Sequence, residues 1–339
     1  MISSLAKVRF LAAAGLAAVA LAACGGDDEE GGNGAPSQTA VQQVEEAAHP
    51  ENFDFPKPNG KTLQQIADMA RTGFTYAPAT SHYVVGNNRM AFGLLDENNK
   101  LIYAPTAVYI ARSPQDKAQG PFYAPTDSLV TKPAYRSKTA ALEGDPVAGI
   151  YSTEIPLPEP GRYAVLVLTN IGGQWRGAAT QVTAQADDPI PAVGERPPAV
   201  KTETLEDVGA KVELIDTREP PSDMHNVSFD EVLGKKPVAL LFATPALCQS
   251  RVCGPVVDIA EQLRNEGYGD DIEFIHQEVW VDNDLNKGLR KPLLEFNLQT
   301  EPWLFTVDAD GKVAARLEGS FGLREFEEAL KAAGGDPDN

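Results

Sequence analysis

The sequence predicts an antiparallel β-sandwich in the middle of the chain and an α/β domain at its C-terminal end. Residues 76–186 contain short apolar segments with period-two alternation, separated by turn signals. Residues 223–339 instead alternate short apolar strands with segments of helical period. Residues 187–222, in which prolines are frequent, form a predicted linker between the two. The 339 residues are enough for two domains, each with its own core.

The first residues have the layout of a secretory signal peptide. Lys7 and Arg9 precede an uncharged apolar run that is too short to span a bilayer comfortably. The run ends in Leu21-Ala22-Ala23-Cys24, which resembles the lipobox of bacterial lipoproteins. The resemblance implies that residues 1–23 are removed, that Cys24 carries the lipid, and that the protein is anchored to the extracytoplasmic side of the cell membrane. The alternative is an ordinary signal peptide in which Cys24 has no role.

The distribution of charge excludes one class of partner. The formal net charge is −19 and no basic stripe occurs, whereas nucleic-acid binding needs basic residues that neutralise phosphates. Much of the acidity lies in residues 24–75, which contain no Lys or Arg before Lys57 and are rich in small and polar residues. This composition predicts a disordered acidic tether and no nucleic-acid partner.

The middle domain is predicted to consist of about seven short strands. The recognisable segments are residues 90–95, 101–103, 107–111, 150–155, 163–169 and 178–182. The corner Pro158-Glu159-Pro160-Gly161-Arg162-Tyr163 resembles the one that precedes a late strand in immunoglobulin-like domains, which implies that Tyr163 hydrogen-bonds back to the turn. We expect no catalytic set in this domain, because His82 stands alone and Trp175 has the position of a buried anchor.

The C-terminal domain has a recognisable order of elements. The predicted segments are strand 238–242, helix 254–266 ending at Gly267, strand 272–281, a helical segment 285–298, hairpin strands 303–307 and 312–317, and helix 323–333. Pro292 interrupts the segment 285–298 and should kink or restart its helix. This order resembles the thioredoxin fold over about a hundred residues. In that family a cis proline precedes the third core strand and faces the active-site cysteines. The resemblance assigns this place, and a part in shaping the peptide-binding groove, to Pro302.

Cys248 and Cys253 are the candidate functional residues. If Cys24 is lipidated, these two remain as a pair in a compartment that permits disulfides. In one continuous helix their Cα atoms would be about 8 to 9 Å apart, beyond disulfide range, so one of them must lie outside the helix. A position at a helix N-terminus, with Arg251 close in sequence, predicts a lowered pKa for Cys253.

The thioredoxin resemblance suggests a role for each cysteine. The run Cys253-Gly254-Pro255 follows the family's Cys-Gly-Pro-Cys and its helix without a gap. This register makes Cys253 the nucleophile and Cys248 the resolving residue. A second register aligns Cys248 with the nucleophile, because it follows the preceding strand at nearly the family's distance.

Thiol–disulfide exchange with a protein thiol or disulfide, without a cofactor, is the predicted function. The alternative is a binding or scaffolding lipoprotein with a structural disulfide. Two departures favour that alternative: the CxxC motif is absent, and Leu240 and Leu241 stand where thioredoxins often keep a buried acid. A minor alternative is a Cu(I) chaperone of the Sco type, although His276 lies too close to the cysteines in sequence. Peroxidase activity is not expected, because Pro245 occupies the place of the peroxiredoxin threonine.

Overall fold

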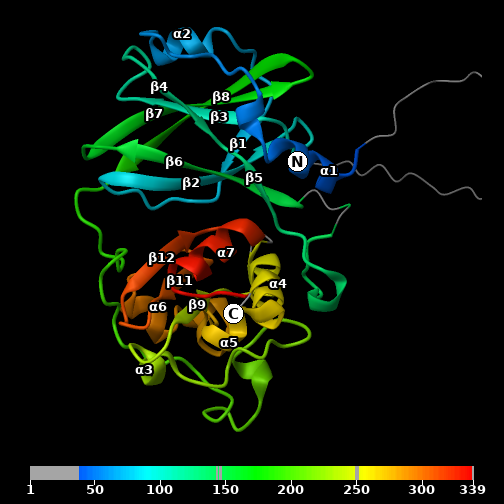
Figure 1. Ribbon diagram of the computed structural model, residues 1–339, viewed down its shortest axis with the longest axis vertical. Coiled ribbons are helices and arrows are strands. Elements are labelled where there is room, and N and C mark those ends of the chain that lie inside the picture. The colour runs from blue at the N-terminus through cyan, green and yellow to red at the C-terminus, as the bar shows by residue number, and fades with distance from the viewer. Residues whose placement is uncertain (1–37, 143, 145–146, 249–251, 338–339) are drawn as a thin grey trace, which may run out of the picture. The chain divides into compact units, whose positions relative to one another are not determined.

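The structure is a computed structural model that describes residues 38–142, 144, 147–248 and 252–337 (Figure 1). In this part of the chain the fold is β-rich, with three four-stranded sheets and few helices. The predicted signal peptide, Cys24 and the first part of the tether lie outside the described residues. Within the described ranges, no helix combines the length and apolar character needed to cross a membrane.

The strands and helices have the following bounds. The strands are β1 (Thr75–Pro78), β2 (Gly86–Leu95), β3 (Thr106–Ala111), β4 (Gln119–Tyr123), β5 (Thr126–Ser128), β6 (Gly149–Leu157), β7 (Gly161–Ile171), β8 (Gln174–Ala184), β9 (Val238–Phe242), β10 (Glu273–Gln277), β11 (Trp303–Val307) and β12 (Val313–Glu318). The helices are α1 (Ala40–Ala47), α2 (Leu63–Ala67), α3 (Phe229–Val232), α4 (Cys253–Leu263), α5 (Gly269–Asp271), α6 (Lys291–Glu295) and α7 (Leu323–Ala332).

Two antiparallel sheets, β1-β2-β6-β5 and β4-β3-β7-β8, share one core, and we call them the paired sheets. Alternation along β3 decides which side chains enter that core: Val108 and Ile110 do, while Tyr109 faces the layer formed with α2. The predicted strands at 90–95, 107–111, 150–155, 163–169 and 178–182 are present, and residue 101 forms only an isolated bridge with Leu95. Strands β1, β4 and β5 were not predicted, because they are short or interrupted by proline.

The corner residue Tyr163 behaves as expected. Its hydroxyl accepts a hydrogen bond from the Glu159 amide and donates one to the Glu159 carbonyl, both at 3.0 Å. Trp175 is half-buried rather than buried, and its ring packs on Phe55 with 4.9 Å between centroids. His82 is not isolated, because its Nε2 lies 2.9 Å from an oxygen of Asp188.

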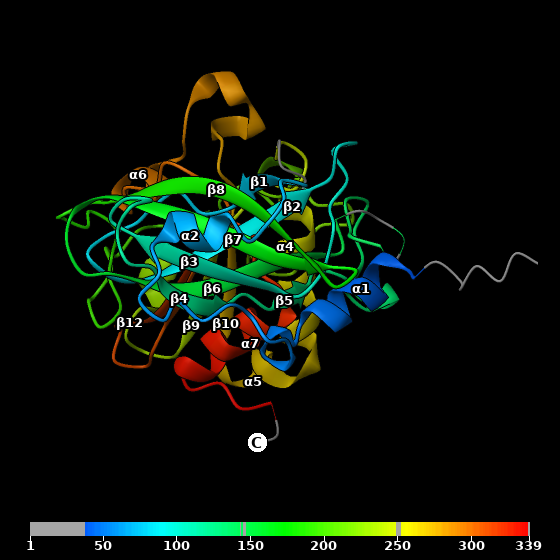
Figure 2. The same ribbon diagram turned by 90° about the horizontal axis from the view of Figure 1, so that it is seen from above.

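The predicted tether and linker both prove too long. Helix α1 lies beside β5 and buries Val44 and Ala47, so residues 40–47 are packed rather than part of a disordered tether (Figure 2). In the proline-rich segment, Ile190 and Val200 belong to the core of the C-terminal sheet, so 187–222 is not a free spacer. The sequence does not predict this packing, because in both segments a few apolar residues are buried among polar neighbours without a repeating pattern.

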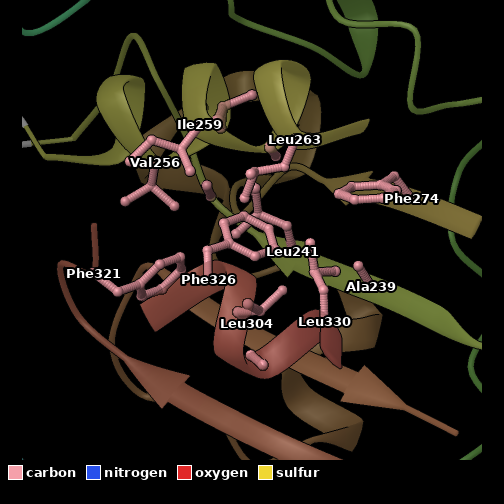
Figure 3. Packing of buried hydrophobic residues seen from close by; sticks show 14 of the residues in the cluster. Ala239, Leu241, Val256, Ile259, Leu263, Phe274, Leu304, Phe321, Phe326 and Leu330 are labelled. Carbon is pink, nitrogen blue, oxygen red and sulfur yellow. The ribbon is translucent and has the colours of Figure 1, made fainter. Parts of the chain in front are cut away.

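The third sheet, β10-β9-β11-β12, has helices on both faces. Strand β9 is buried throughout and alternates between two cores. Ala239 and Leu241 face α4 and α7 (Figure 3), whereas Leu240 and Phe242 face α3 and α6. Parallel pairing of β9 with β10 requires a crossover, and α4 lies in that connection.

The helices of this region differ from their predicted bounds chiefly in two places. Helix α4 ends at Leu263, and after a wider turn Gly267 adopts a left-handed φ of 118°, close to the predicted end. The predicted helical segment 285–298 contains a 3₁₀ turn at Leu285–Lys287 and the short helix α6. Pro292 lies in its first turn, where its missing N–H costs nothing, so the helix restarts at this proline, which is one of the two expected outcomes.

A buried ion pair joins the paired sheets to α7. Nε and Nη2 of Arg89 donate to the two carboxylate oxygens of Glu325, both at 2.7 Å, and Arg89 also donates to the carbonyls of Glu318 and Ser320. The Asp127 carboxylate accepts the amides of Arg324 and Glu325 at the start of α7. Burial raises the pKa of Asp127 to about 6. The junction is therefore held by hydrogen-bonded charges.

We predict that Arg89→Ala lowers the free energy of unfolding by about 3–5 kcal/mol, because it leaves the Glu325 carboxylate buried without its partner. Urea denaturation of the full chain measures this loss. The exposed Arg162→Ala is the control and should change stability by less than about 0.5 kcal/mol. The pair Arg89→Met with Glu325→Leu should recover part of the loss. A full, undiminished loss in the double variant would argue against an unpaired charge as the cause.

Candidate functional site

Two cysteines and a carboxyl group meet at the start of α4. The helix begins at Cys253, and Cys248 lies in the turn after β9, where its amide donates to the Thr244 carbonyl at 3.1 Å. The sulfur atoms of both cysteines and a carboxylate oxygen of Glu301 all lie within 4.8 Å of one another. As the spacing predicts, one cysteine lies outside the helix. Both are thiols in this structure.

The two thiols differ in exposure. Cys253 is 0% exposed, whereas Cys248 is half-buried. Burial raises the pKa of the Cys253 thiol well above its usual value, and the neighbouring Cys248 and the charge of Glu301 act in the same direction. The predicted lowering of this pKa is therefore wrong, because loss of hydration outweighs the helix terminus. Arg251 lies outside the described residues.

Glu301 is the acid of the site. The Cys253 thiol donates to a carboxylate oxygen of Glu301 at 3.5 Å. Burial, together with the neighbouring Cys248 and Glu278, raises the pKa of Glu301 to about 8. Strand β9, where the resemblance would place a buried acid, holds the apolar Leu240 and has no acidic residue. The acid comes instead from the segment before β11.

Strand pairing explains how Glu301 reaches the cysteines. Strand β11 pairs antiparallel with β9, with Trp303 opposite Phe242. The residues just before β11 therefore lie beside those just after β9, which lead into the cysteine turn. The Glu301–Pro302 peptide bond is cis, as the resemblance implies for Pro302. The Pro302 carbonyl accepts a hydrogen bond from the Gly319 amide at 2.8 Å, which ties this segment to the end of β12.

A second buried cluster includes His276 of β10, the strand that pairs with β9, and was not predicted from the sequence. Asp216, His225 and His276 are all at most 3% exposed, with ligand atoms within 4.8 Å of one another. His225 Nε2 lies 3.0 Å and His276 Nδ1 3.7 Å from Asp216 oxygens. These nitrogen and oxygen atoms are the types that bind zinc or iron, whereas two thiolates suit Cu(I). Only the folding of the supposed linker brings Asp216 to the histidines.

The cluster is connected to the cysteine turn through hydrogen bonds. His276 Nε2 lies 3.0 Å from the carbonyl of Ala243, the residue before Thr244. Burial alone would lower the pKa of His276, but Asp216 outweighs it and raises that pKa to about 9. Burial would raise the pKa of Asp216, yet the two histidines keep it below its usual value. The Ala243 carbonyl is thus held by a positively charged imidazolium.

Helix α4 itself is fixed by a buried ion pair. Arg218 Nε donates to one oxygen of Asp258 at 2.9 Å, and the amide and hydroxyl of Ser137 donate to the other, both at 3.0 Å. Arg218 also donates to the carbonyl of Tyr135. The orientation of α4 therefore depends on residues far apart in the sequence.

Comparison with known proteins finds no match: no protein-family model fits this chain, and no curated protein is similar to it. The function is therefore inferred from the geometry of the site.

We predict that Asp216→Asn lowers the free energy of unfolding by about 3–5 kcal/mol at pH 6, because it removes the partner of a buried imidazolium. A raised folded-state pKa for His276 stabilises the fold fully below pH 6.5, and this contribution is lost as the pH rises through about 9. The loss between pH 6.5 and 9 should be smaller in Asp216→Asn than in the wild type. Glu301 titrates in both proteins, so their difference reports on the two histidines that contact Asp216.

Urea unfolding at several pH values measures this difference, with the exposed Asp207→Asn as the matched control. Parallel stability curves for the wild type and Asp216→Asn would contradict the assignment.

Proposed function

We propose that this protein carries out thiol–disulfide exchange with a protein partner through Cys248 and Cys253. The observation that carries the proposal is the meeting of a half-buried thiol, a buried thiol and an ionisable carboxyl group within 4.8 Å. Exchange needs one accessible sulfur to attack, a second sulfur to resolve, and a group that accepts the proton of the second. No cofactor is needed for this chemistry.

The arrangement of elements supports a thioredoxin-like domain over residues 223–339. Strand order β10-β9-β11-β12, with β9 and β10 parallel and β11 antiparallel to them, agrees with the proposed fold. Two helices on each face agree as well. The antiparallel paired sheets and the Tyr163 corner support an immunoglobulin-like sandwich before it.

Burial favours the second register of the cysteines. Cys253 has no exposed surface, so a substrate disulfide meets Cys248 first. Thiolate Cys248 attacks one substrate sulfur, a mixed disulfide forms, and the other substrate sulfur leaves as a thiolate. Cys253 then gives its proton to Glu301 and attacks the Cys248 sulfur, which releases the second substrate thiolate. The substrate gains two electrons, and the protein is left with a Cys248–Cys253 disulfide.

The location of this activity is proposed from the N-terminal sequence. A lipobox-like Leu21-Ala22-Ala23-Cys24 supports lipid attachment at Cys24 and anchoring to the outer face of the cell membrane. That compartment permits disulfides, which agrees with a dithiol that cycles between two oxidation states.

We predict that Cys253→Ser accumulates a mixed disulfide at Cys248, because attack remains possible while resolution does not. Cys248→Ser should form none at a comparable rate. Mass spectrometry after acid quenching measures both. A mixed disulfide trapped on Cys253 instead of Cys248 would support the first register, in which Cys253 is the nucleophile.

In the wild type, a redox titration with thiol trapping should give a potential between about −120 and −270 mV. A value below about −300 mV, together with no exchange activity, is the result expected of a structural disulfide in a scaffolding lipoprotein. Stoichiometric Cu(I) binding that is lost in either cysteine variant would favour copper delivery.

We predict that Glu301→Gln slows the resolving step by about 10²-fold or more, because the Cys253 proton loses its acceptor. In the wild type this step should accelerate as the pH rises through about 8, where the Glu301 carboxyl ionises. Ellman's disulfide releases one thiolate in each step, so the second phase in stopped flow reports resolution. Exposed Glu295→Gln is the control. An unchanged second phase and pH profile in Glu301→Gln would exclude this role.

A further inference from the structure

The buried cluster of Asp216, His225 and His276 has the dimensions of a metal site. His225 Nε2 and His276 Nδ1 lie 3.0 and 3.7 Å from the two oxygens of Asp216. In a tetrahedral zinc site with bonds of about 2.0–2.1 Å, the ligand atoms lie roughly 3.3 Å apart. The two observed distances bracket that value, and one ligand atom of each residue lies within 4.8 Å of the others. Small shifts of the side chains would therefore admit a zinc ion.

His276 is held in the orientation of a metal ligand. Its Nε2 donates to the Ala243 carbonyl at 3.0 Å, which leaves Nδ1 to face Asp216. That Nδ1 is fully buried and has no hydrogen-bond partner among the described residues. Histidines that bind a metal almost always donate their other ring N–H to a carbonyl, a carboxylate or water. The His276 amide also donates to the Met224 carbonyl at 3.0 Å, which ties the loop of the cluster to β10.

The Asp216 carboxylate is oriented by its own loop. The amide and hydroxyl of Ser222 donate to Oδ2 at 2.7 and 2.8 Å, and the Arg218 amide donates to Oδ1 at 2.8 Å. Carboxylates that bind a metal are supported by outer hydrogen bonds of this kind. His225 Nε2 lies 3.3 Å from the Ser222 hydroxyl and 3.0 Å from Oδ2, and a metal ion would replace the contact with Oδ2.

The buried charges around the cluster match a divalent cation. Glu278 follows β10 and is 0% exposed. One of its oxygens accepts from the amide and hydroxyl of Thr217, whereas Oε2 has no partner within the described ranges. Among the residues that the structure describes, no Lys or Arg forms an ion pair with Glu278 or Asp216. Two carboxylates beside two neutral imidazoles carry two negative charges, which one divalent ion neutralises and a single proton does not.

We propose that Asp216, His225 and His276 bind one zinc ion, with Glu278 as the second compensating charge. Two imidazole nitrogens, a carboxylate oxygen and a water are ligands that zinc accepts. Calcium and magnesium prefer shells of six or more oxygens, and Cu(I) prefers thiolates. Iron(II) oxygenase sites use the same three protein ligands but keep open positions for substrate. Side chains that are at most 3% exposed do not offer such positions, so the burial favours zinc.

A surface cleft gives a cation a route to the cluster. Asp216 lines a cleft of about 690 Å³, together with the exposed Glu213 and the Lys138–Glu219 ion pair. A cation that enters this cleft meets the carboxylate of the cluster without unfolding of the chain.

Zinc would take the place of the proton on the His276 ring. The imidazolium described above belongs to the metal-free protein, and the hydrogen bond to the Ala243 carbonyl persists in both states. The stability curves of the wild type and Asp216→Asn are therefore recorded with EDTA present.

The test separates this site from the cysteines, which are also zinc ligands. The full chain carrying Cys248→Ser and Cys253→Ser is freed of metal with EDTA, dialysed, and titrated with Zn²⁺ against a chelator of known affinity. This double variant should bind one equivalent of zinc. His225→Gln in the same background should weaken binding by more than the about 10–100-fold that loss of an outer partner costs. The exposed His49→Gln is the matched control and should leave the affinity unchanged.

Ser222→Ala supplies a second variant, which keeps all three ligands and removes one hydrogen bond to Asp216. We expect zinc affinity to fall by about 10–100-fold. Circular dichroism checks that each variant folds, and if His225→Gln does not fold, the affinity of Ser222→Ala decides. Zinc should also raise the thermal unfolding midpoint of the double cysteine variant as its concentration increases.

X-ray absorption at the zinc edge identifies the ligands, and it should show nitrogen and oxygen at about 2.0–2.1 Å and no sulfur at about 2.3 Å. Failure of the double cysteine variant to bind zinc, sulfur in the zinc shell of that variant, or an affinity unchanged by both His225→Gln and Ser222→Ala would overturn the proposal. The double variant has no thiol pair, so its zinc binding is independent of the proposed exchange function.

Discussion

Burial of Cys253 at the first residue of α4 is the constraint on which the site depends. A helix N-terminus ordinarily favours a thiolate, but a side chain with no exposed surface loses the hydration that a thiolate requires. The thiol keeps its proton and donates it to Glu301. The same burial leaves Cys248 as the sulfur that a large partner can reach, so exposure rather than sequence order assigns the two roles in the proposed reaction.

Segments that are distant in the sequence hold this arrangement. Pairing of β11 with β9 brings Glu301 beside the cysteine turn, and the Arg218–Asp258 pair fixes α4. Thr217, next to Arg218, donates through its amide and hydroxyl to Glu278 and accepts the Ala246 amide, which lies two residues before Cys248. A site built from so many segments cannot form before the chain has folded around it, which couples its geometry to overall stability.

The sequence predicts the elements of this region better than its chemistry. Strand β9, the start of α4 and the β11–β12 hairpin follow from apolar runs, a Gly-Pro step and a turn signal, which are local properties. Glu301 is a lone acid in a polar stretch, and its proximity to the cysteines appears only with strand register. Asp216 lies in a proline-rich segment without period, so nothing local indicates that it is buried. The lowered pKa expected for Cys253 fails for the same reason, because burial is a long-range property.

Buried charged residues of the paired sheets hold the chain that lies near the cysteines. Arg89 and Asp127 bind the chain after β12 and the start of α7, and this fixes an apolar wall beside Glu301. Loss of either contact would release the wall while leaving both cysteines on α4 and its preceding turn. The buried Arg89–Glu325 pair therefore couples the position of this wall to the packing of the paired sheets.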